Sequence, residues 1–223
     1  MINLFDKITV IAPHPDDETL GVGGTIARFV DEGKKVSVLF VSGHLPPIYK
    51  EKDFEKVQLE AVNAMKQLGV EKYEFLKIPA TTLSNHSVAD LNNRIKSFID
   101  EMEPNVVFLP FPDRHIDHRV IFDASVVACR PVKQNAPKVV LAYETLSETH
   151  WNVPGIEPVF APEFFIDISN YIENKTKALD CYISQIKDNS SRSIDATKAL
   201  AKFRGSQNGC FYAEAFKVVR IVF

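Results

Sequence analysis

Two short clusters of histidine and aspartate hold most of the reactive side chains in this sequence. The first, Pro13-His-Pro-Asp-Asp-Glu18, places His14 just before a group of carboxylates. The second, Pro110-Phe-Pro-Asp-Arg-His-Ile-Asp-His118, ends in two histidines that flank an aspartate. Adjacent carboxylates repel one another, and a cation relieves that repulsion when a nearby imidazole supplies the nitrogen that transition metals prefer. The two clusters therefore predict a metal site.

The spacing within the clusters suggests which residues bind the ion. His14 and Asp17 are three positions apart, so one tight loop can bring both to the same ion. His118 is the third candidate because it lies furthest into the second cluster. Two histidines, one carboxylate and an open position for water form a catalytic zinc site. We expect Zn²⁺ as the cofactor, with another divalent ion such as Fe²⁺ as the alternative.

The remaining residues of the clusters are candidates for acid–base chemistry. A bound metal lowers the pKa of its water, and Asp16 would then accept a proton as general base. His115, if protonated, would stabilise a developing oxyanion or give a proton to a leaving amine. Asp117 would orient one of the metal-binding histidines. Glu18 either orients His14 or lies at a helix N-terminus, where its negative charge is favoured.

Polar residues in the surrounding loops are candidates for substrate contacts. They are Ser42, His44, Arg114, Glu144 and His150. The isolated histidines His44, His86 and His150 each stand in a polar loop, where a surface position is the simpler interpretation. His44 directly follows a predicted strand, and it and His150 remain candidates for contact with a substrate.

Apolar strand-like runs alternate with amphipathic helical segments, as in a parallel α/β sheet. The predicted strands are residues 8–11, 35–41, 73–78, 106–109, 138–143 and 164–168, and residues 215–222 form a last strand or the end of a helix. The predicted helices are residues 19–32, 53–68, 87–101, 119–129, 170–186 and 195–203. We expect one Rossmann-like domain over residues 1–223, with a mainly parallel sheet of order 3-2-1-4-5 and helices on both faces.

This strand order predicts that the two clusters meet. The first and fourth strands lie side by side in it, and their outgoing loops diverge to open a crevice at the carboxyl edge of the sheet. The first cluster follows the first strand, and the second cluster follows the fourth. Topology alone therefore brings both to one site.

Composition excludes several classes of partner. The formal net charge of −3 and the lack of a Lys/Arg run argue against nucleic acid. No apolar run approaches the roughly 20 residues that span a bilayer, and the first residues do not form a signal peptide. The three cysteines are widely spaced and form no C-x-x-C motif, which argues against disulfides and a thiolate zinc site: Cys129, Cys181 and Cys210. A cytoplasmic protein with a small-molecule substrate is expected, and a homo-oligomer is compatible with the sequence.

Two other classes of protein share part of this pattern. A receiver-type signalling domain also has an acidic pair after its first strand, where it binds magnesium, but it has neither the histidine nor the second cluster. A dinucleotide-binding module would need G-x-G-x-x-G, which Gly21-Val-Gly-Gly24 does not match. Close packing of a helix on the sheet is the better explanation of these glycines.

At these residues the chain resembles the LmbE-like (PIG-L) family of zinc-dependent N-deacetylases. The family motif A-H-P-D-D-E corresponds to residues 13–18, with Pro13 in place of alanine, and the motif H-x-D-H corresponds to residues 115–118. The closing segment from Arg204-Gly to Tyr212-Ala-Glu-Ala-Phe216 is also similar. The likeness extends from the first strand almost to the end of the chain.

The resemblance implies a Rossmann-like fold and hydrolysis of an N-acyl group, usually acetyl, from an amino sugar. It implies His14, Asp17 and His118 as zinc ligands, Asp16 as general base and His115 as the group that stabilises the tetrahedral intermediate. Such a substrate can be the sugar itself or its glycoside or nucleotide conjugate. An amidohydrolase acting on a non-sugar N-acyl compound is the alternative.

The chain departs from the family in one loop that helps to form the sugar site. A Gly-Glu loop is common after the family's second strand, and Ser42-Gly-His44 replaces it here. The segment Tyr143-Glu-Thr-Leu-Ser-Glu-Thr-His-Trp151 resembles members associated with bacterial glycan and small-thiol assembly. The resemblance therefore specifies the reaction more closely than the sugar.

Overall fold

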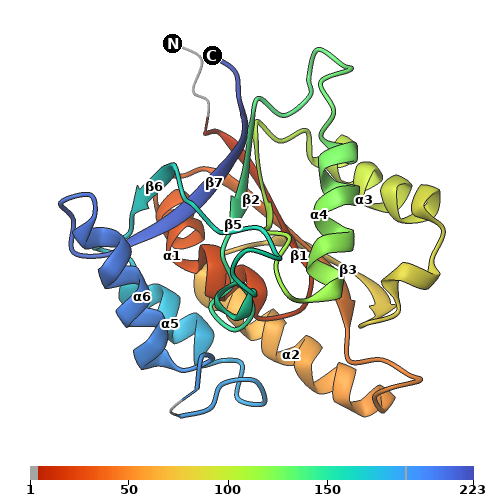
Figure 1. Ribbon diagram of the computed structural model, residues 1–223, viewed down its shortest axis with the longest axis horizontal. Coiled ribbons are helices and arrows are strands. Elements are labelled where there is room, and N and C mark those ends of the chain that lie inside the picture. Colours follow the sequence, from red (N-terminus) through yellow and green to blue (C-terminus); the bar gives the residue numbers. More distant parts are fainter. Residues whose placement is uncertain (1–4, 189) are drawn as a thin grey trace.

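The protein is built around one seven-stranded sheet, seen in a computed structural model that describes residues 5–188 and 190–223 (Figure 1). The strand order is β3-β2-β1-β4-β5-β7-β6. The strands are β1 (Lys7–Ala12), β2 (Lys35–Gly43), β3 (Lys72–Pro79), β4 (Val106–Pro110), β5 (Val139–Tyr143), β6 (Phe164–Asp167) and β7 (Ala213–Ile221). Strands β1 to β5 pair in parallel, whereas β7 runs antiparallel to both β5 and β6. The predicted order 3-2-1-4-5 is confirmed.

Helices cover both faces of the sheet. One face carries α1 (Asp17–Asp31), α2 (Glu51–Leu68), α5 (Ile172–Leu179) and α6 (Ile194–Ser206), and the other carries α3 (Val88–Met102) and α4 (Ile116–Ala128). Two short 3-10 turns, η1 (Leu83–Asn85) and η2 (Thr149–Trp151), lie in the connecting loops. Successive strand residues alternate between the two faces of the sheet. Val10 therefore packs in the apolar core beneath α1 and α2, and Ile11 packs in the core beneath α3 and α4.

The central strands are mostly apolar because both faces of the sheet are covered. All five residues of β4 are buried, and Ile8 and Val10 of β1 lie in register with Val106 and Phe108 of β4. This register fixes the relative position of the two carboxyl ends, from which the two histidine–aspartate clusters emerge.

The glycines at the start of α1 allow close packing, as predicted. A Cβ atom on Gly21 would lie 2.2 Å from Cδ2 of Tyr143, and one on Gly24 would lie 2.6 Å from Cδ1 of Ile168. Either contact would force the helix away from the sheet. The glycines therefore set how near the first turns of α1 come to the strands beneath them.

The helix predicted over residues 170–186 is shorter than expected. Helix α5 ends at Leu179, and the chain continues through turns. The Tyr182 hydroxyl donates to Glu18 at 2.6 Å, and Ser184 donates to Glu60 through both its backbone N–H and its hydroxyl. These bonds to α1 and α2 outweigh the helical propensity of the segment. A non-local partner, invisible in the sequence, determines where the helix ends.

The carboxyl-terminal part also differs in detail from prediction. Helix α6 extends through Ser206, beyond the predicted end at residue 203. The last segment is a strand rather than the end of a helix, and it inserts between β5 and β6. None of the helices in the described part of the chain combines the length and hydropathy needed to cross a bilayer.

Candidate active site

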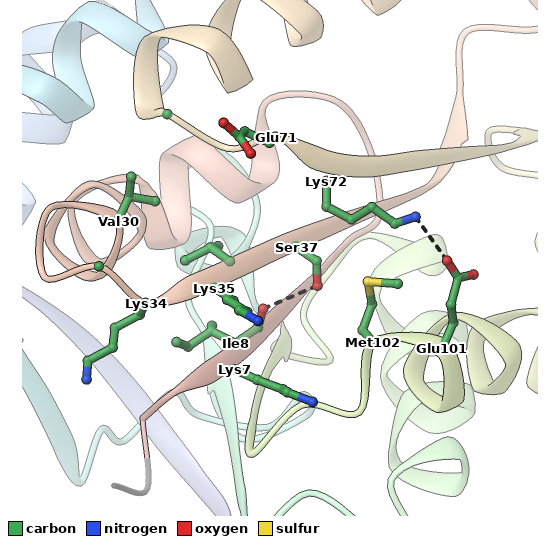
Figure 2. A pocket seen from close by; sticks show the side chains of 13 residues that line it. Lys7, Ile8, Val30, Lys34, Lys35, Ser37, Glu71, Lys72, Glu101 and Met102 are labelled. Carbon is green, nitrogen blue, oxygen red and sulfur yellow. Dashed lines mark hydrogen bonds and ion pairs between the residues drawn. The ribbon is translucent and has the colours of Figure 1, made fainter.

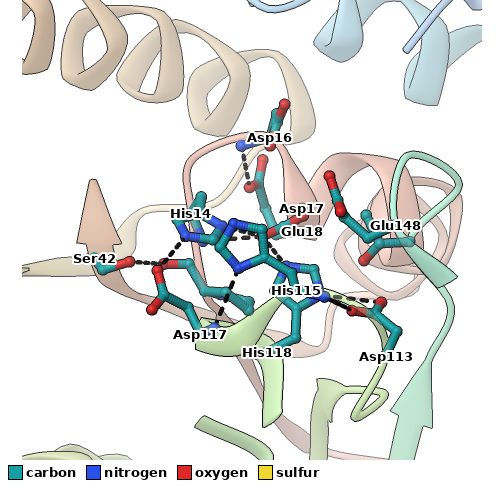
Figure 3. A network of polar contacts seen from close by, with 12 residues as sticks. His14, Asp16, Asp17, Glu18, Ser42, Asp113, His115, Asp117, His118 and Glu148 are labelled. Carbon is teal, nitrogen blue, oxygen red and sulfur yellow. Dashed lines mark hydrogen bonds and ion pairs between the residues drawn. The ribbon is translucent and has the colours of Figure 1, made fainter. Parts of the chain in front are cut away.

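The two histidine–aspartate clusters meet at the carboxyl edge of β1 and β4, as topology predicted (Figure 3). The ring centroids of His14 and His115 are 4.6 Å apart, and those of His14 and His118 are 5.6 Å apart. Segments distant in the sequence therefore contribute to one site. The loop from β1 to α1 supplies one side of it, and the start of α4 supplies the other.

The three predicted metal ligands lie in contact with one another. Asp17 Oδ2 lies 3.1 Å from His14 Nδ1 and 3.2 Å from His118 Nε2. Asp17 and His118 are fully buried, and His14 is partly exposed. One carboxylate oxygen and two imidazole nitrogens converge here, which is the donor set of a catalytic zinc site.

Each of these histidines is held on its far side by a carboxylate. His14 Nε2 lies 3.0 Å from Asp117 Oδ2, and His118 Nδ1 lies 3.1 Å from Asp113 Oδ2. Such a bond keeps the proton on the outer nitrogen and leaves the inner nitrogen free to bind a metal. His118 Nε2 is buried and has no hydrogen-bond partner among the described residues. A metal ion would satisfy this otherwise costly buried atom.

The electrostatics of the pair also favour a cation. Burial lowers the pKa of both histidines, but hydrogen bonds to Asp117 and Asp17 raise that of His14 to about 9. The charge of Asp17 and the bond to Asp113 likewise overcome burial and raise the pKa of His118 to about 10. Positive charge is therefore strongly stabilised between these carboxylates, whether a proton or a metal ion carries it.

His115 is held by a backbone contact at the start of α4. Its Nδ1 accepts the backbone N–H of Asp117 at 3.1 Å, which caps α4 and leaves the proton on Nε2. Burial, together with the charges of His14 and His118, lowers its pKa to about 4. The sequence left a protonated His115 open as one possibility, and these effects disfavour that form. His14, His115 and His118 offer nitrogens within 4.8 Å of one another, so three histidines are the alternative ligand set.

Asp16 adopts an unusual backbone conformation at the start of α1. Its φ angle is 117°, a region that an L-residue rarely occupies without strain. The side chain is 2% exposed, and its Oδ2 has no hydrogen-bond partner among the described residues. Burial raises the pKa of this carboxyl to about 8, with Arg192 opposing the rise. A cation bound beside this carboxyl would lower its pKa again, towards the range in which a carboxylate can act as a general base.

Glu18 follows the second of its two predicted alternatives. It lies in the first turn of α1 and accepts hydrogen bonds from the backbone N–H of Asp16 and from the Thr19 and Tyr182 hydroxyls. No bond joins it to His14 among the described residues. It therefore holds the strained turn that presents Asp16.

A cavity of about 110 Å³ adjoins the cluster. It is lined by His14, Pro15, Asp16, His44, Tyr49, Val57, Ala80, Thr81, His115, Glu148, Gln185 and Arg192. The reactive groups thus open onto a small and mostly polar space. The volume accommodates an acetyl-sized group and part of what carries it.

A larger hollow of about 550 Å³ lies at the opposite edge of the sheet, where the strands begin (Figure 2). Its polar lining is Lys7, Lys34, Lys35, Ser37, Glu71, Lys72 and Glu101. The carboxyl ends of α1, α2 and α3 point towards this edge, and the lysines offset their partial negative charge. The hollow contains no residue of either cluster, so size alone does not locate the site.

The five residues predicted to contact a substrate differ in whether they line the cavity. His44 lines the cavity, whereas Ser42, Arg114, Glu144 and His150 do not. The Ser42 hydroxyl donates to the Pro13 carbonyl at 3.0 Å. Arg114 pairs with Glu157, and Glu144 binds the Arg204 guanidinium in a bidentate manner with His150 beside it. Of these five residues, His44 is placed to meet a ligand in the cavity.

Several site residues were missed by sequence reasoning. Asp113 lies in the second cluster, and its position shortly before His118 in the sequence was the signal that could have identified it. Arg192 follows a serine-rich turn without a motif, yet its Nε lies 3.7 Å from Asp16 Oδ2 and its guanidinium lies 3.5 Å from Glu148. Tyr49 and Gln185 line the cavity from two further segments. Only the fold brings these side chains together.

The fold and this cluster define an α/β protein in which histidines and carboxylates converge at one edge of the sheet, where they could hold a metal ion. The chain belongs to the PIG-L family, described as GlcNAc-PI de-N-acetylase, which matches residues 9–129. It is 26% identical to the diacetylchitobiose deacetylase of Thermococcus kodakarensis over an alignment 235 positions long. The alignment covers 99% of this chain and 86% of that protein.

Solved structures share the whole architecture. The conserved protein TT1542 from Thermus thermophilus aligns with a TM-score of 0.78 and 28% identity, covering 97% of this chain and 96% of that chain. A 4-carboxy-2-hydroxymuconate hydratase from Pseudomonas putida aligns with a TM-score of 0.77 and 18% identity, covering 98% of both chains. Since one fold supports two different reactions, function must be argued from the site.

Proposed function

We propose that the protein is a zinc-dependent hydrolase that removes the N-acetyl group of an amino sugar or its conjugate and releases acetate. The observation that carries the proposal is the convergence of His14 Nδ1, Asp17 Oδ2 and His118 Nε2 beside the buried carboxyl of Asp16, whose Oδ2 accepts no hydrogen bond from the described residues. The deacetylase names of the relatives support the reaction class.

His14, Asp17 and His118 would hold the ion, and Asp117 and Asp113 would orient the two histidines from behind. When bound, zinc would acidify the attacking water and polarise the acyl carbonyl. A harder ion such as Mg²⁺ would need a shell of oxygen ligands, which two imidazoles do not provide. Fe²⁺ also accepts imidazole and carboxylate ligands and stays the alternative.

Asp16 would act as general base on the water. Its Oδ2 is buried, accepts no hydrogen bond from the described residues and has only the longer ion pair with Arg192 beside it, so it can accept the proton as the water attacks the amide carbon. The same carboxyl would then give that proton to the departing nitrogen. The C–N bond breaks, and acetate and an amine are the products.

His115 would stabilise the oxygen that becomes negative during the attack. Because Nδ1 accepts the Asp117 N–H, the Nε2–H is the donor that remains for the oxyanion. A neutral ring suffices for this task. The low pKa of His115 therefore fits a hydrogen-bond donor better than a proton carrier.

The amide chemistry alone does not select a sugar. A small, mostly polar cavity and relatives named for diacetylchitobiose and N-acetyl-alpha-D-glucosaminyl L-malate support an N-acetylglucosamine type of substrate. A non-sugar N-acyl compound is the alternative.

A substrate panel tests the reaction. Zinc-loaded protein is incubated with N-acetylglucosamine, its glycoside, nucleotide-linked and lipid-linked forms, chitooligosaccharides and N-acetylated peptides. Acetate release and the corresponding mass loss are expected from at least one sugar. Cleavage confined to peptides, or no amide cleavage at all, would reject the sugar deacetylase.

A further inference from the structure

Two aromatic rings lie against each other beside the catalytic cluster. The ring centroids of His44 and Tyr49 are 4.3 Å apart, with 26° between the ring planes. His44 follows β2 and Tyr49 precedes α2, so the pair belongs to the loop that joins these elements. Both residues line the same cavity as His14 and Asp16.

The outer surface of this pair remains available to a ligand. Tyr49 keeps 36% of its surface exposed in spite of the stacking. Among the described residues, no hydrogen bond is found to the ring nitrogens of His44 or to the Tyr49 hydroxyl. The pair therefore presents flat aromatic surface edged by free polar atoms. The rest of the fold makes no use of those polar atoms.

Three other residues of the cavity lining are strongly polar. They come from segments that follow β5 and α5, and each offers a charged or amide group: Glu148, Gln185 and Arg192. A pyranose ring needs both kinds of surface. Its face carries C–H groups whose slightly positive hydrogens suit the negative face of an aromatic ring, and its rim carries hydroxyls that need donors and acceptors.

We propose that the His44–Tyr49 pair is a stacking surface for the pyranose ring of the substrate. The inference rests on the proposed function and adds to it, since it distinguishes a cyclic amino sugar from an open-chain N-acetyl amine. With the sugar face against the rings, its acetamido group reaches Asp16 and His115, which line the same cavity. The pair thus determines specificity and takes no part in bond breaking.

The test compares steady-state kinetics of Tyr49→Ala, Tyr49→Phe and wild-type protein on the best sugar of the panel. Loss of one stacking contact is expected to raise KM on the order of threefold to tenfold, with kcat within about twofold. Tyr49→Phe, which keeps the ring, should recover most of the affinity. Phe211→Ala is the control, because Phe211 is an aromatic residue that is 80% exposed and lies outside the cavity lining.

The outcomes separate this inference from the proposed function. Acetate release by the wild type, with an unchanged KM in Tyr49→Ala, would overturn the stacking surface and leave the deacetylase intact. An equal rise in KM for Tyr49→Ala and Tyr49→Phe would also overturn it, because the hydroxyl would then be responsible.

A binding measurement decides the matter if the wild type releases no acetate. Saturation-transfer NMR with N-acetylglucosamine should show transfer to the sugar ring protons in the wild type and its loss in Tyr49→Ala. Absence of transfer in the wild type, or equal transfer in both proteins, would overturn the stacking surface.

Discussion

His118 is anchored by Asp113 on the side of its ring that faces away from Asp17. The Nδ1 to Oδ2 distance is 3.1 Å, and both side chains are buried. The opposite nitrogen, Nε2, points at the Asp17 carboxylate without a hydrogen-bond partner among the described residues. Asp113 therefore fixes which nitrogen of His118 is available to a metal ion.

Replacing Asp113 should weaken metal binding although Asp113 is not a ligand. Asp113→Ala is expected to lower zinc affinity on the order of tenfold to a hundredfold, because the ring loses its orientation and its proton position. Competition with a chromophoric chelator measures this affinity. Asp123→Ala, at an exposed position on the same helix as His118, is the control. Equal affinities in the two variants would show that the Asp113 contact has no influence on the metal.

Asp16 and Asp17 should differ in kind although they are adjacent. Asp16→Asn is expected to keep the metal and lose roughly a hundredfold or more in kcat, because an amide cannot accept the proton of water. Asp17→Asn should reduce metal content, since the oxygen between His14 and His118 is changed. Elemental analysis and kinetics on the same samples give both quantities. Matching behaviour of the two variants would contradict this division of roles.

A buried ion pair beneath α1 should be costly to break. Lys175 Nζ lies 2.6 Å from Glu214 Oε1 and also donates to the Leu20 carbonyl, and Glu214 accepts the N–H groups of Gly24 and Thr25. Lys175→Met leaves Glu214 buried and unpaired, and a loss of about 3–5 kcal/mol in unfolding free energy is expected.

The matched control for this ion pair lies on the surface. Lys198→Met removes the pairing of Lys198 with Glu173, where both side chains are partly exposed, and should cost no more than about 1 kcal/mol. Urea denaturation measures both variants. Similar losses in the two would mean that the buried pair contributes no more than a surface pair.

The three cysteines should differ in reactivity. Burial raises the pKa of Cys129 to about 12, and its side chain is 1% exposed, whereas Cys181 and Cys210 are partly exposed. A thiol reagent at about pH 8 should therefore modify two of the three thiols in native protein and all three in denaturant. Cys129→Ala should leave the native count unchanged. Rapid modification of all three in the native state would contradict the burial of Cys129.

Patterns that are local in the sequence predicted the centre of the fold well. Apolar β-branched runs such as Val106–Leu109 identified the strands, and their alternation with helices predicted the order of the first five. That order was enough to bring His14 and His118 together. It required no knowledge of the reaction, because adjacent parallel strands must end at the same edge.

Contacts between distant segments could not be predicted in this way. The insertion of β7 between β5 and β6, and the end of α5 at Leu179, depend on partners far along the chain. For the same reason Arg192 carried no signal. The sequence identified Glu144 as a carboxylate that could contact a substrate. It could not predict that the Arg204 guanidinium binds this carboxylate outside the cavity. Residue types indicate what chemistry is available, and packing decides which residues can perform it.

The most direct test of the account is acetate release by metal-stripped protein as zinc is added back. Wild-type protein is dialysed against chelator, then titrated with Zn²⁺ in the presence of an N-acetylated amino sugar, beside His118→Ala as the variant that lacks one ligand. The account predicts negligible release without metal and a rise that saturates at about one ion per chain. His118→Ala should stay inactive throughout. Full activity of the stripped wild type, or equal recovery by His118→Ala, would contradict a zinc-dependent deacetylase built on His14, Asp17 and His118.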